Sequence, residues 1–319
     1  MLRIGLLGAS KIAPTAVIEP ARHNPAFVVT AVGARDAQRA HAYAQEHDIP
    51  AVADGYAALI AREDVDIVYN ALPPAGHEAW TIAAVAAGKT VLCEKPFAKS
   101  SGPARAMVAA AAAAGQVLLE AFHYRHHNVI RRAEAIVRSG VLGRLVRAEA
   151  MFDANIPRDP DELRWRADLG GGGLMDLGCY PLHALRTLIG SEPRIVSAQA
   201  RFEDGVDTEM AASLMFAGDV EASLACSMIA ERPAATLTLT GERGNLKIIN
   251  YLAPQIGCRF TTTIGGVTTI EPTEGPTTYV AQLEHLRAVL QDGAAPLVGG
   301  ADAIANMTAI DAIYEAAGR

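Results

Sequence analysis

The sequence predicts an α/β protein in which a Rossmann-type, doubly wound parallel sheet precedes an α+β domain with a largely antiparallel open sheet. Up to about residue 120, short apolar runs alternate with Ala-rich helical stretches, the rhythm of βαβ units. A glycine-containing turn directly follows the first run. Beyond residue 120, strand-like runs follow one another at antiparallel spacing. For 319 residues we expect a dinucleotide domain over 1–121, a substrate and oligomerisation domain over 122–298, and a C-terminal helix over 299–319 that packs back on the body.

Composition excludes several classes of function. Half of the residues are hydrophobic and 20% are charged, the balance of a globular enzyme. A net charge of -7 without any basic run argues against nucleic acid, and the most apolar stretch, 107–120, is too short to span a bilayer. The four cysteines show no metal-type or disulfide-type spacing, and no signal peptide precedes the first apolar run. We therefore expect a cytoplasmic protein that binds neither nucleic acid nor membrane.

The individual elements follow from apolar periodicity and from start signals such as Pro, Asp, Ser and Gly. In the first half we expect strands at 2–8, 27–34, 66–72, 90–94 and 116–120, and helices that begin near Lys11, Asp36, Gly55, Gly76 and Ser100. In the second half we expect a helix at 128–139, a helix from Gly173, and strands at 144–152, 194–202, 210–217, 221–229, 235–241 and 245–251. Ligands of such a parallel sheet bind at the carboxyl ends of its strands.

The turn "GASKIA" at 8–13 predicts a dinucleotide site. It lies between the first strand and the first helix, where backbone N–H groups and the helix dipole face a pyrophosphate. Ser10 stands where the fingerprint usually has its second glycine. The expected contacts from this turn are Gly8, Ser10, Ile12 and Ala13.

The end of the second strand predicts a preference for NADP(H), with NAD(H) bound at lower affinity. An NAD-preferring site places a carboxylate here for the ribose 2′-hydroxyl, but this chain has Ala34 followed by Arg35. Arg39 lies one helical turn further and can share a 2′-phosphate. Both arginines are therefore candidate cofactor ligands.

The stretch "GGGGLMDLGCYPLH" at 170–183 predicts a glycine-rich entrance to a helix that is pressed against another backbone or a flat ring. On that helix Asp176, Tyr180 and His183 fall on one stripe. Pro181 lacks an N–H group and is expected to kink the helix just after Tyr180.

A resemblance becomes clear at "CEKPFA", residues 93–98. A strand ending in Glu-Lys-Pro, between a Rossmann beginning and a Gly-Gly-Gly…Asp-x-Gly-x-Tyr segment, resembles the Gfo/Idh/MocA family of NAD(P)-dependent oxidoreductases. The segments at 120–127 and 142–152 are most similar to its branch with dimeric dihydrodiol dehydrogenase and D-xylose 1-dehydrogenase. Where many relatives have Pro-Asn-x-x-His, this chain reads "PPAGH", with Pro74 in the place of the asparagine and His77 retained. The resemblance implies further cofactor contacts, which are Leu72, His77, Glu94 and Lys95.

Hydride transfer needs a group that moves the alcohol proton, and a phenol does so at neutral pH only if a cation stabilises its phenolate. With the resemblance, this assigns Tyr180 as acid/base, Lys95 as the cation, and Asp176 as a hydrogen-bond partner of substrate or lysine. His183 remains an alternative proton-transfer group. Arg125, Trp165, Asp176 and His183 are the expected substrate contacts. No metal is expected, because no carboxylate or cysteine lies at ligand spacing from the histidines near Arg125.

The resulting expectation is an NADP-dependent oxidoreductase acting on a sugar or polyhydroxylated ring. Oxidation of an aldose or a trans-dihydrodiol and reduction of an anhydroketose would all suit these residues. The alternative is a cofactor-binding sensor of the same fold without turnover. An open sheet needs cover on its second face, so we also expect a homodimer or homotetramer.

Overall fold

The computed structural model describes residues 1–159 and 162–319 as two compact units. The first unit comprises 1–122 and 279–304, and the second comprises 123–278 and 305–319. Residues 279–304 thus cluster with the N-terminal residues, and residues 305–319 cluster with the second unit.

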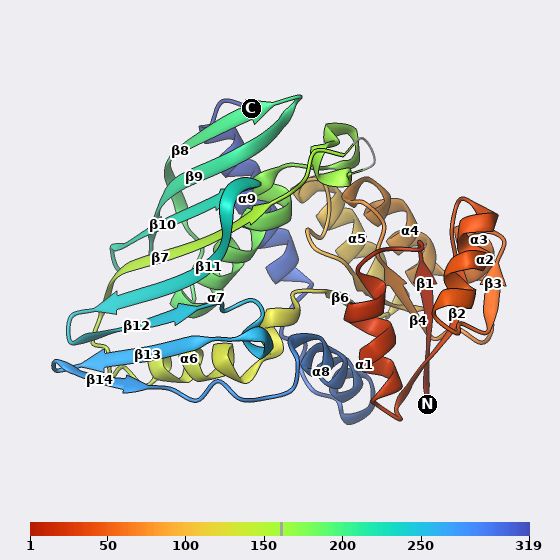
Figure 1. Cartoon of the computed structure of the whole chain (residues 1–319), viewed down its shortest axis with the longest axis horizontal. Helices are drawn as coiled ribbons and strands as arrows, with labels where there is room; N and C mark the ends of the chain where they lie inside the picture. Colours follow the sequence, from red (N-terminus) through yellow and green to blue (C-terminus); the bar gives the residue numbers. More distant parts are fainter. Residues whose placement is uncertain (160–161) are drawn as a thin grey trace. The chain divides into compact units, whose positions relative to one another are not determined.

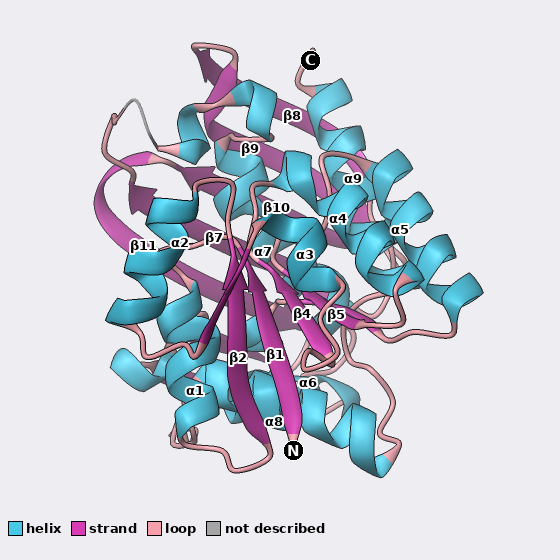
Figure 2. Cartoon of the chain, turned by 90° about the vertical axis from the view of Figure 1, so that its right-hand side faces the viewer, coloured by secondary structure: helices cyan, strands magenta, loops and turns pink. Residues whose placement is uncertain are grey.

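A six-stranded parallel sheet forms the first unit, in the order β3-β2-β1-β4-β5-β6. Figure 2 shows β2, β1, β4 and β5 side by side. The strands are β1 (Leu2–Leu7), β2 (Phe27–Gly33), β3 (Ala51–Ala53), β4 (Ile67–Asn70), β5 (Thr90–Cys93) and β6 (Leu118–Glu120). The predicted Rossmann fold is confirmed. Strand β3, three residues long, has too little periodicity to be recognised in the sequence.

Helices connect these strands as crossovers. They are a π-type turn (Pro14–Ile18) that continues into α1 (Glu19–Arg22), then α2 (Ala37–Glu46), α3 (Gly55–Ile60), α4 (Pro74–Ala86) and α5 (Ser101–Ala114). The later helix α8 (Thr278–Asp292) contributes Leu283 and Leu286 to the core of this unit. That buried contact is the reason why residues 279–298 belong to the first unit.

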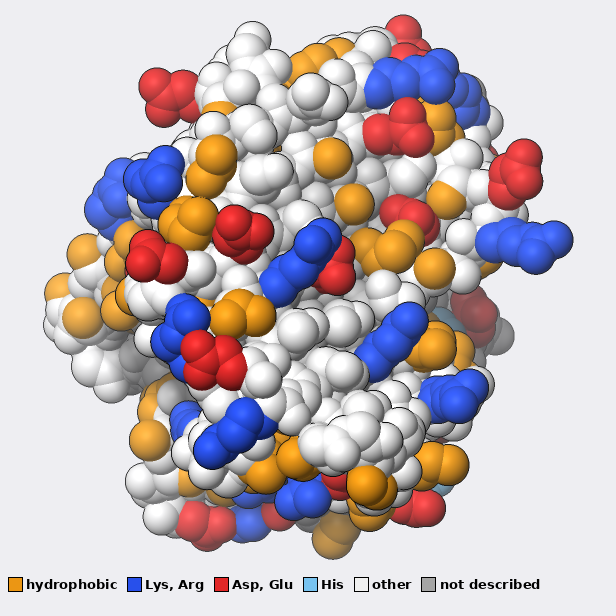
Figure 3. All heavy atoms as spheres, turned by 90° about the vertical axis from the view of Figure 1, so that its left-hand side faces the viewer, with side chains coloured by type: hydrophobic (Ala, Val, Ile, Leu, Met, Phe, Trp, Pro, Cys, Tyr) orange, Lys and Arg blue, Asp and Glu red, His pale blue; other side chains and the backbone are white. Residues whose placement is uncertain are grey.

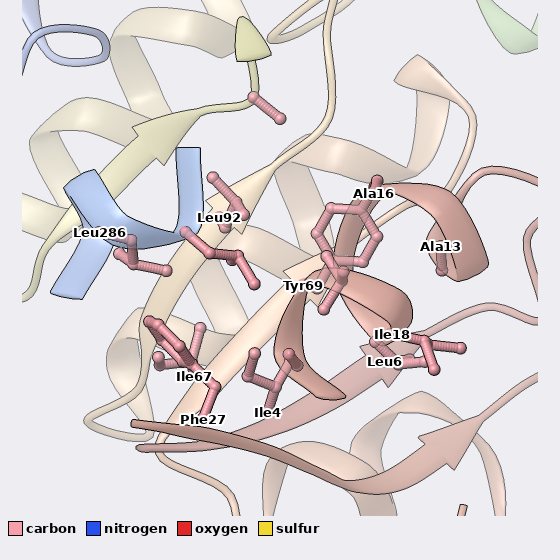
Figure 4. Packing of buried hydrophobic residues seen from close by; sticks show 14 of the residues in the cluster. Ile4, Leu6, Ala13, Ala16, Ile18, Phe27, Ile67, Tyr69, Leu92 and Leu286 are labelled. Atoms are coloured by element: carbon pink, nitrogen blue, oxygen red, sulfur yellow. The ribbon is translucent and has the colours of Figure 1, made fainter. Parts of the chain in front are cut away.

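The core beside the first helix is built from neighbouring strands. Ile4 and Leu6 of β1, Ile67 and Tyr69 of β4, and Leu286 of α8 are all at most 1% exposed and pack in one cluster (Figure 4). Each buried aliphatic or aromatic side chain of this size contributes about 1.5–3 kcal/mol. This packing fixes the carboxyl ends of β1, β2, β4 and β5, where the nucleotide site is expected.

The second unit is built on an eight-stranded mixed, mostly antiparallel sheet in the order β14-β13-β12-β11-β7-β10-β9-β8 (Figure 1). Only β10 and β7 pair in parallel. The strands are β7 (Leu145–Asn155), β8 (Arg194–Glu203), β9 (Val206–Phe216), β10 (Val220–Ser227), β11 (Ile229–Gly241), β12 (Gly244–Ile249), β13 (Arg259–Ile264) and β14 (Val267–Ile270). The last two were not expected, since β14 is fully exposed and lacks alternation.

One face of this sheet is covered by helix α7 (Cys179–Ile189), which contacts β7 and β10, and α6 (Asn128–Arg138) packs on α7. Burial alternates along β9, where Met210, Ala212 and Leu214 are buried while Ala211 and Ser213 are exposed. The second face is therefore open. Figure 3, viewed from the side on which β8, β9 and β10 lie in Figure 1, shows hydrophobic and charged side chains interspersed over the surface.

The remaining elements of the second unit are short, apart from the last helix. They are 3-10 turns at His123–His126, Leu163–Trp165, Ala167–Leu169 and Pro254–Ile256, a π-type turn at Leu174–Gly178, and α9 (Ala301–Ala316), whose residues from Ala305 on belong to this unit. Among residues 1–159 and 162–319, no helix is both long and apolar enough to cross a bilayer.

Candidate active site

The first turn of the nucleotide domain has the geometry of a phosphate-binding loop. Gly8 has a φ of +92°, and a Cβ there would lie 3.1 Å from Leu72 Cδ2. Ser10 Oγ accepts a hydrogen bond from the Ala13 N–H at 3.2 Å, so the serine side chain bonds the backbone of its own turn. Ile12 is 37% exposed beside this turn, whereas Ala13 is fully buried. The turn fits a pyrophosphate because its glycine leaves the backbone uncovered on one side.

Two arginines gather at the end of β2. Ala34 is buried, Arg35 is exposed, and the Arg39 guanidinium donates to the Ala9 carbonyl at 2.8 Å. The adjacent carboxylate, Asp36, caps α2 by accepting from the Arg39 N–H at 2.7 Å. Burial raises the pKa of Tyr56, and both arginines oppose that rise, so their positive charges reach the same phenol. This end of the strand therefore suits a phosphate better than a ribose hydroxyl.

The end of β5 carries the Glu94-Lys95-Pro96 segment, in which Lys95 is half-buried. Glu94 accepts from the Tyr69 hydroxyl at 2.5 Å and from the Lys95 N–H at 3.3 Å. The Lys95–Pro96 peptide is cis. These bonds fix the backbone from which the lysine side chain projects.

His77 ties two loops of the first unit together. Its Nε2 lies 2.7 Å from the Leu72 carbonyl, and its Nδ1 lies 3.1 Å from that of Pro96 and 3.2 Å from that of Phe97. Burial lowers the pKa of His77, and the backbone carbonyls partly offset that effect. Pro74, in the place of the asparagine of relatives, is the first residue of α4. His77 is placed to hold Leu72 and the Lys95 loop, a role that the sequence did not suggest.

In the second unit, the glycine run is pressed against backbone, as its composition predicts. A Cβ on Gly171 would lie 2.5 Å from the Arg164 carbonyl oxygen, and one on Gly172 would collide with Asp207 Oδ1. Asp207 accepts from the Leu174 N–H and from the Tyr314 hydroxyl, each at 2.6 Å. Burial raises the pKa of this carboxyl. Sequence reasoning missed Asp207, although an aspartate inside a strand is itself an unusual signal.

Asp176 pairs with an arginine that the sequence analysis did not single out. Arg164 Nε lies 2.6 Å from Asp176 Oδ2, and its NH1 lies 2.9 Å from Glu162. The charge of Asp176 is the largest cause of the raised pKa of Arg164. The aspartate was expected to bond substrate or Lys95, and the structure gives it this ion pair as a partner.

The helix that carries Tyr180 changes type at its start. Residues Leu174–Gly178 form a π-type turn, and α7 begins at Cys179. Pro181 lies in the first turn of α7, where its missing N–H is tolerated. A Cβ on Gly178 would lie 2.9 Å from Cys226 Sγ, so a glycine lets this turn approach β10 closely.

The Tyr180 side chain is 6% exposed, and its hydroxyl lies 3.3 Å from His123 Nε2. The rings of His123, Tyr124 and Phe152 meet it edge-on, with centroids 5.7–5.9 Å away. His183 is fully buried, and its Nδ1 lies 2.5 Å from the Tyr124 hydroxyl. The two candidate proton-transfer residues thus have different partners, which are adjacent in the chain.

Arg125 and Trp165, also expected to contact the substrate, form hydrogen bonds and ion pairs with other residues of the second unit. Arg125 is 6% exposed and forms an ion pair with Glu134 at 3.1 Å. Trp165 is half-buried, its indole N–H donates to the Pro157 carbonyl at 3.2 Å, and the Arg158 guanidinium lies 4.2 Å above its ring. Over the described part of the chain, no three His, Cys, Asp or Glu side chains are grouped as metal ligands.

A six-stranded parallel sheet with a glycine turn after β1 is the fold of an NAD(P)-binding domain. The comparisons with known proteins give the family. The Gfo/Idh/MocA C-terminal domain matches residues 130–247, and the NAD-binding Rossmann fold of the oxidoreductase family matches residues 2–122. The chain therefore belongs to the Gfo/Idh/MocA family, as its motifs predict.

Individual relatives are similar over most of the chain. D-xylose 1-dehydrogenase (NADP(+)) 2 of Haloferax volcanii is 32% identical over 318 residues, which cover 99% of this chain and 97% of that protein. A trans-1,2-dihydrobenzene-1,2-diol dehydrogenase of Macaca fascicularis is 31% identical over 252 residues, covering 78% and 73%. Among solved structures, aldose-aldose oxidoreductase from Caulobacter crescentus complexed with glycerol has a TM-score of 0.91 at 29% identity and covers 100% of this chain and 98% of that one.

Proposed function

We propose that this protein is an NADP-dependent dehydrogenase or reductase of a cyclic sugar or polyol, acting at a secondary or anomeric carbon. The observation that carries the proposal is the buried Tyr180 hydroxyl, which lies 3.3 Å from His123 Nε2 within a cluster of aromatic rings. A phenol that is hydrogen-bonded to an imidazole is suited to proton transfer. The names of the relatives, two sugar oxidoreductases and a dihydrodiol dehydrogenase, support a polyhydroxylated ring as substrate.

The cofactor contacts that we propose follow four strands of the first unit, β1, β2, β4 and β5. The turn after β1 would hold the pyrophosphate, and the end of β2 would hold the 2′-phosphate through Arg35. When bound, the nicotinamide supplies or accepts the hydride. The contacts are Gly8, Ser10, Ile12, Ala13, Arg35, Arg39, Leu72, His77, Glu94 and Lys95.

The catalytic roles follow from the chemistry of the side chains. Tyr180 takes the proton of the substrate hydroxyl in oxidation and returns it in reduction. Lys95 lowers the pKa of that phenol by its positive charge. Asp176, through its ion pair with Arg164, orders the glycine-rich entrance from which the tyrosine helix starts.

A panel of substrates tests this function. Wild-type protein is assayed by nicotinamide absorbance with D-xylose, D-glucose and trans-1,2-dihydrobenzene-1,2-diol, each with NADP⁺ and with NAD⁺. We expect turnover of at least one probe, faster with NADP⁺. Binding of NADPH without turnover of any probe would instead favour a sensor.

Substitution of the tyrosine tests the mechanism. Tyr180→Phe should lower kcat by roughly 10²- to 10⁴-fold, the usual contribution of general acid–base catalysis, and should leave NADPH affinity unchanged. Tyr251→Phe is the matched control, because this buried phenol lies at the edge of Tyr124 and forms no hydrogen bond with any described residue. Near wild-type kcat in Tyr180→Phe would transfer the role to His183.

We also propose that the protein is cytoplasmic and forms a homo-oligomer through the open face of the eight-stranded sheet. All four cysteines are free thiols, as in a reducing compartment. A shallow hollow on the open face is lined by small side chains of β7, β8, β9 and β10, among them Ala211, Ser213, Ser223 and Ala225. Such a surface allows the close approach of a second sheet. A monomeric mass in light scattering at micromolar concentration would reject the oligomer.

A further inference from the structure

The Tyr180 hydroxyl is the first group of a three-membered polar chain inside the second unit. His123 Nε2 lies 3.3 Å from the Tyr180 hydroxyl, and His123 Nδ1 lies 2.8 Å from Thr278 Oγ1. His123 is 7% exposed and Thr278 is fully buried. The imidazole therefore bridges the phenol and a buried hydroxyl with both of its nitrogens.

A neutral imidazole between two hydroxyls allows two proton arrangements, because each hydroxyl can donate or accept. In the arrangement that permits proton transfer, the phenol hydroxyl donates to Nε2. Nε2 accepts that bond only if the single proton of the neutral ring is on Nδ1, from where it is donated to Thr278 Oγ1. In this tautomer Thr278 Oγ1 accepts from the Nδ1–H group, the position that a carbonyl or carboxylate takes behind other catalytic histidines. The 3.3 Å distance is at the long end of hydrogen-bond reach, which is common for catalytic pairs before substrate binds.

The other imidazole of this region belongs to a separate pair. His183 Nδ1 bonds the Tyr124 hydroxyl at 2.5 Å, and the ring of Tyr124 meets those of Tyr180 and Tyr251 edge-on. His123 bonds the hydroxyl of Tyr180, whereas His183 bonds that of Tyr124, so the two imidazoles can be varied independently by mutation.

We propose that His123 is a proton-relay partner of Tyr180, a role that rests on the proposed dehydrogenase function. In oxidation, the substrate O–H bond breaks and its proton binds to Tyr180 Oη, while the proton of Tyr180 moves to His123 Nε2. The C–H hydride leaves with its electron pair to the oxidised nicotinamide, and the substrate gains a C=O bond. His123 becomes an imidazolium whose Nδ1–H remains bonded to Thr278, and it then releases one proton to solvent. Reduction runs the same transfers in reverse.

The tautomer of His123 tests the relay without any turnover. The protein is labelled with ¹⁵N-histidine, and the His123 signals among the nine histidines are assigned by their loss in His123→Gln. We expect the Nδ1-protonated tautomer in wild type, a changed Nε2 signal in Tyr180→Phe, and a changed Nδ1 signal in Thr278→Val. The His183 signals should keep their positions in Thr278→Val. The proposal would be overturned by a proton on Nε2 in the resting protein, or by a His123 Nε2 signal that is unchanged in Tyr180→Phe.

Kinetics with the best substrate of the panel test the catalytic consequence. Loss of a hydrogen bond to a developing charge lowers a rate by roughly ten- to a hundredfold. His123→Gln should therefore lower kcat by that factor and leave KM nearly unchanged. In the Tyr180→Phe background, His123→Gln should cause no further loss, because the relay has already lost its first member. Added imidazole should restore part of the activity of His123→Ala, and His23→Gln, at an exposed histidine, is the control.

The outcomes separate this proposal from the function on which it rests. If wild type oxidises none of the probes, the proposed function fails, and the ¹⁵N spectra still decide whether His123 is the partner of Tyr180. Additive losses in the double variant, or no rescue by imidazole, would mean that His123 only packs against the tyrosine.

Discussion

The two glycine-containing turns of the molecule differ in what makes glycine necessary. At the turn after β1, Gly8 has a positive φ, and an added Cβ would meet only the end of the flexible Leu72 side chain at 3.1 Å. At the entrance to the tyrosine helix, a Cβ on Gly171 would lie 2.5 Å from the Arg164 carbonyl oxygen. The first turn needs glycine because of its own backbone conformation. The second needs it for two reasons, because Gly172 has a φ of +129° and because protein groups such as the Arg164 carbonyl and Asp207 fill the space beside the run.

This difference indicates how each turn serves the protein. Where a glycine is required by its backbone conformation alone, the space beside it is open to a ligand. Where a glycine is required because neighbouring groups are too close for a Cβ, that space is already occupied by protein. The second turn therefore acts by positioning the helix of Asp176 and Tyr180 against β9 and β10, and not by cradling a phosphate.

Substitution of the second turn should have the largest effect on stability. Gly171→Ala places a methyl group against the backbone of Arg164 and Leu163, which cannot move as a side chain can. We expect a loss of about 3 kcal/mol in the free energy of unfolding, the upper end for overpacked sites. Urea denaturation measures it. Gly102→Ala in α5, where no atom lies within 4 Å of the added Cβ, should be neutral or stabilising. Equal effects of the two substitutions would show that the backbone beside Gly171 can accommodate a Cβ.

The nucleotide site, at the end of β2, should respond to the loss of a positive charge. Arg35→Ala removes the cation proposed to bind the 2′-phosphate, and a charge-assisted hydrogen bond is worth about 1.5–3 kcal/mol, or roughly ten- to a hundredfold in affinity. NADPH binding should weaken by that factor, and NADH binding should not change. Fluorescence titration measures both affinities, and Arg22→Ala, at an exposed arginine that is ion-paired with Glu19, is the control. Equal weakening for both cofactors would contradict the strand-end interpretation.

The pH dependence of stability tests the carboxylate behind the second turn. Burial raises the pKa of Asp207 in the folded protein, so the fold favours its neutral form. The stability that depends on this proton is complete below the unfolded pKa, near 4, and is lost as the pH rises through the folded value.

Asp207→Asn should remove this dependence of stability on pH, and the amide oxygen can still accept from the Leu174 N–H. We expect a cost of about 1 kcal/mol at low pH, from the altered bond to Tyr314, that shrinks as the pH rises. Urea midpoints from pH 4 to 8 measure it, with Asp219→Asn in the exposed β9–β10 turn as the control. A cost that grows with pH would show that the ionised carboxylate is the stabilising form.

The smallest effect is expected where the second unit has an unsatisfied group. The Tyr251 hydroxyl is buried without a hydrogen bond to the described residues, and burial raises the pKa of this phenol well above its ordinary value. Tyr251→Phe should therefore leave stability within about 1 kcal/mol of wild type or raise it, because an unpaired polar group is removed. Thermal unfolding measures the change, and a clear loss of stability would reveal a partner for this hydroxyl.

The sequence by itself determined the features that depend on local pattern. Alternation of apolar runs with helical stretches predicted the Rossmann domain. Ala34, which stands where an NAD-preferring site has a carboxylate, and the arginines that follow it predicted a positively charged end of β2. The motifs at 93–98 and 170–180 identified the family. Each of these signals is carried by neighbours in the chain, where periodicity and residue type are informative.

Only the tertiary structure decided which groups pair across long separations. It assigned Arg164 to Asp176, Asp207 to the glycine run, and His123 to Tyr180, and it placed Leu283 and Leu286 in the core of the first unit. The strands β13 and β14 also escaped prediction. The three bonded pairs are 12, 33 and 57 residues apart in the chain, and they meet because the sheet registers and helix packing bring them together. A single sequence carries no pattern that records such contacts.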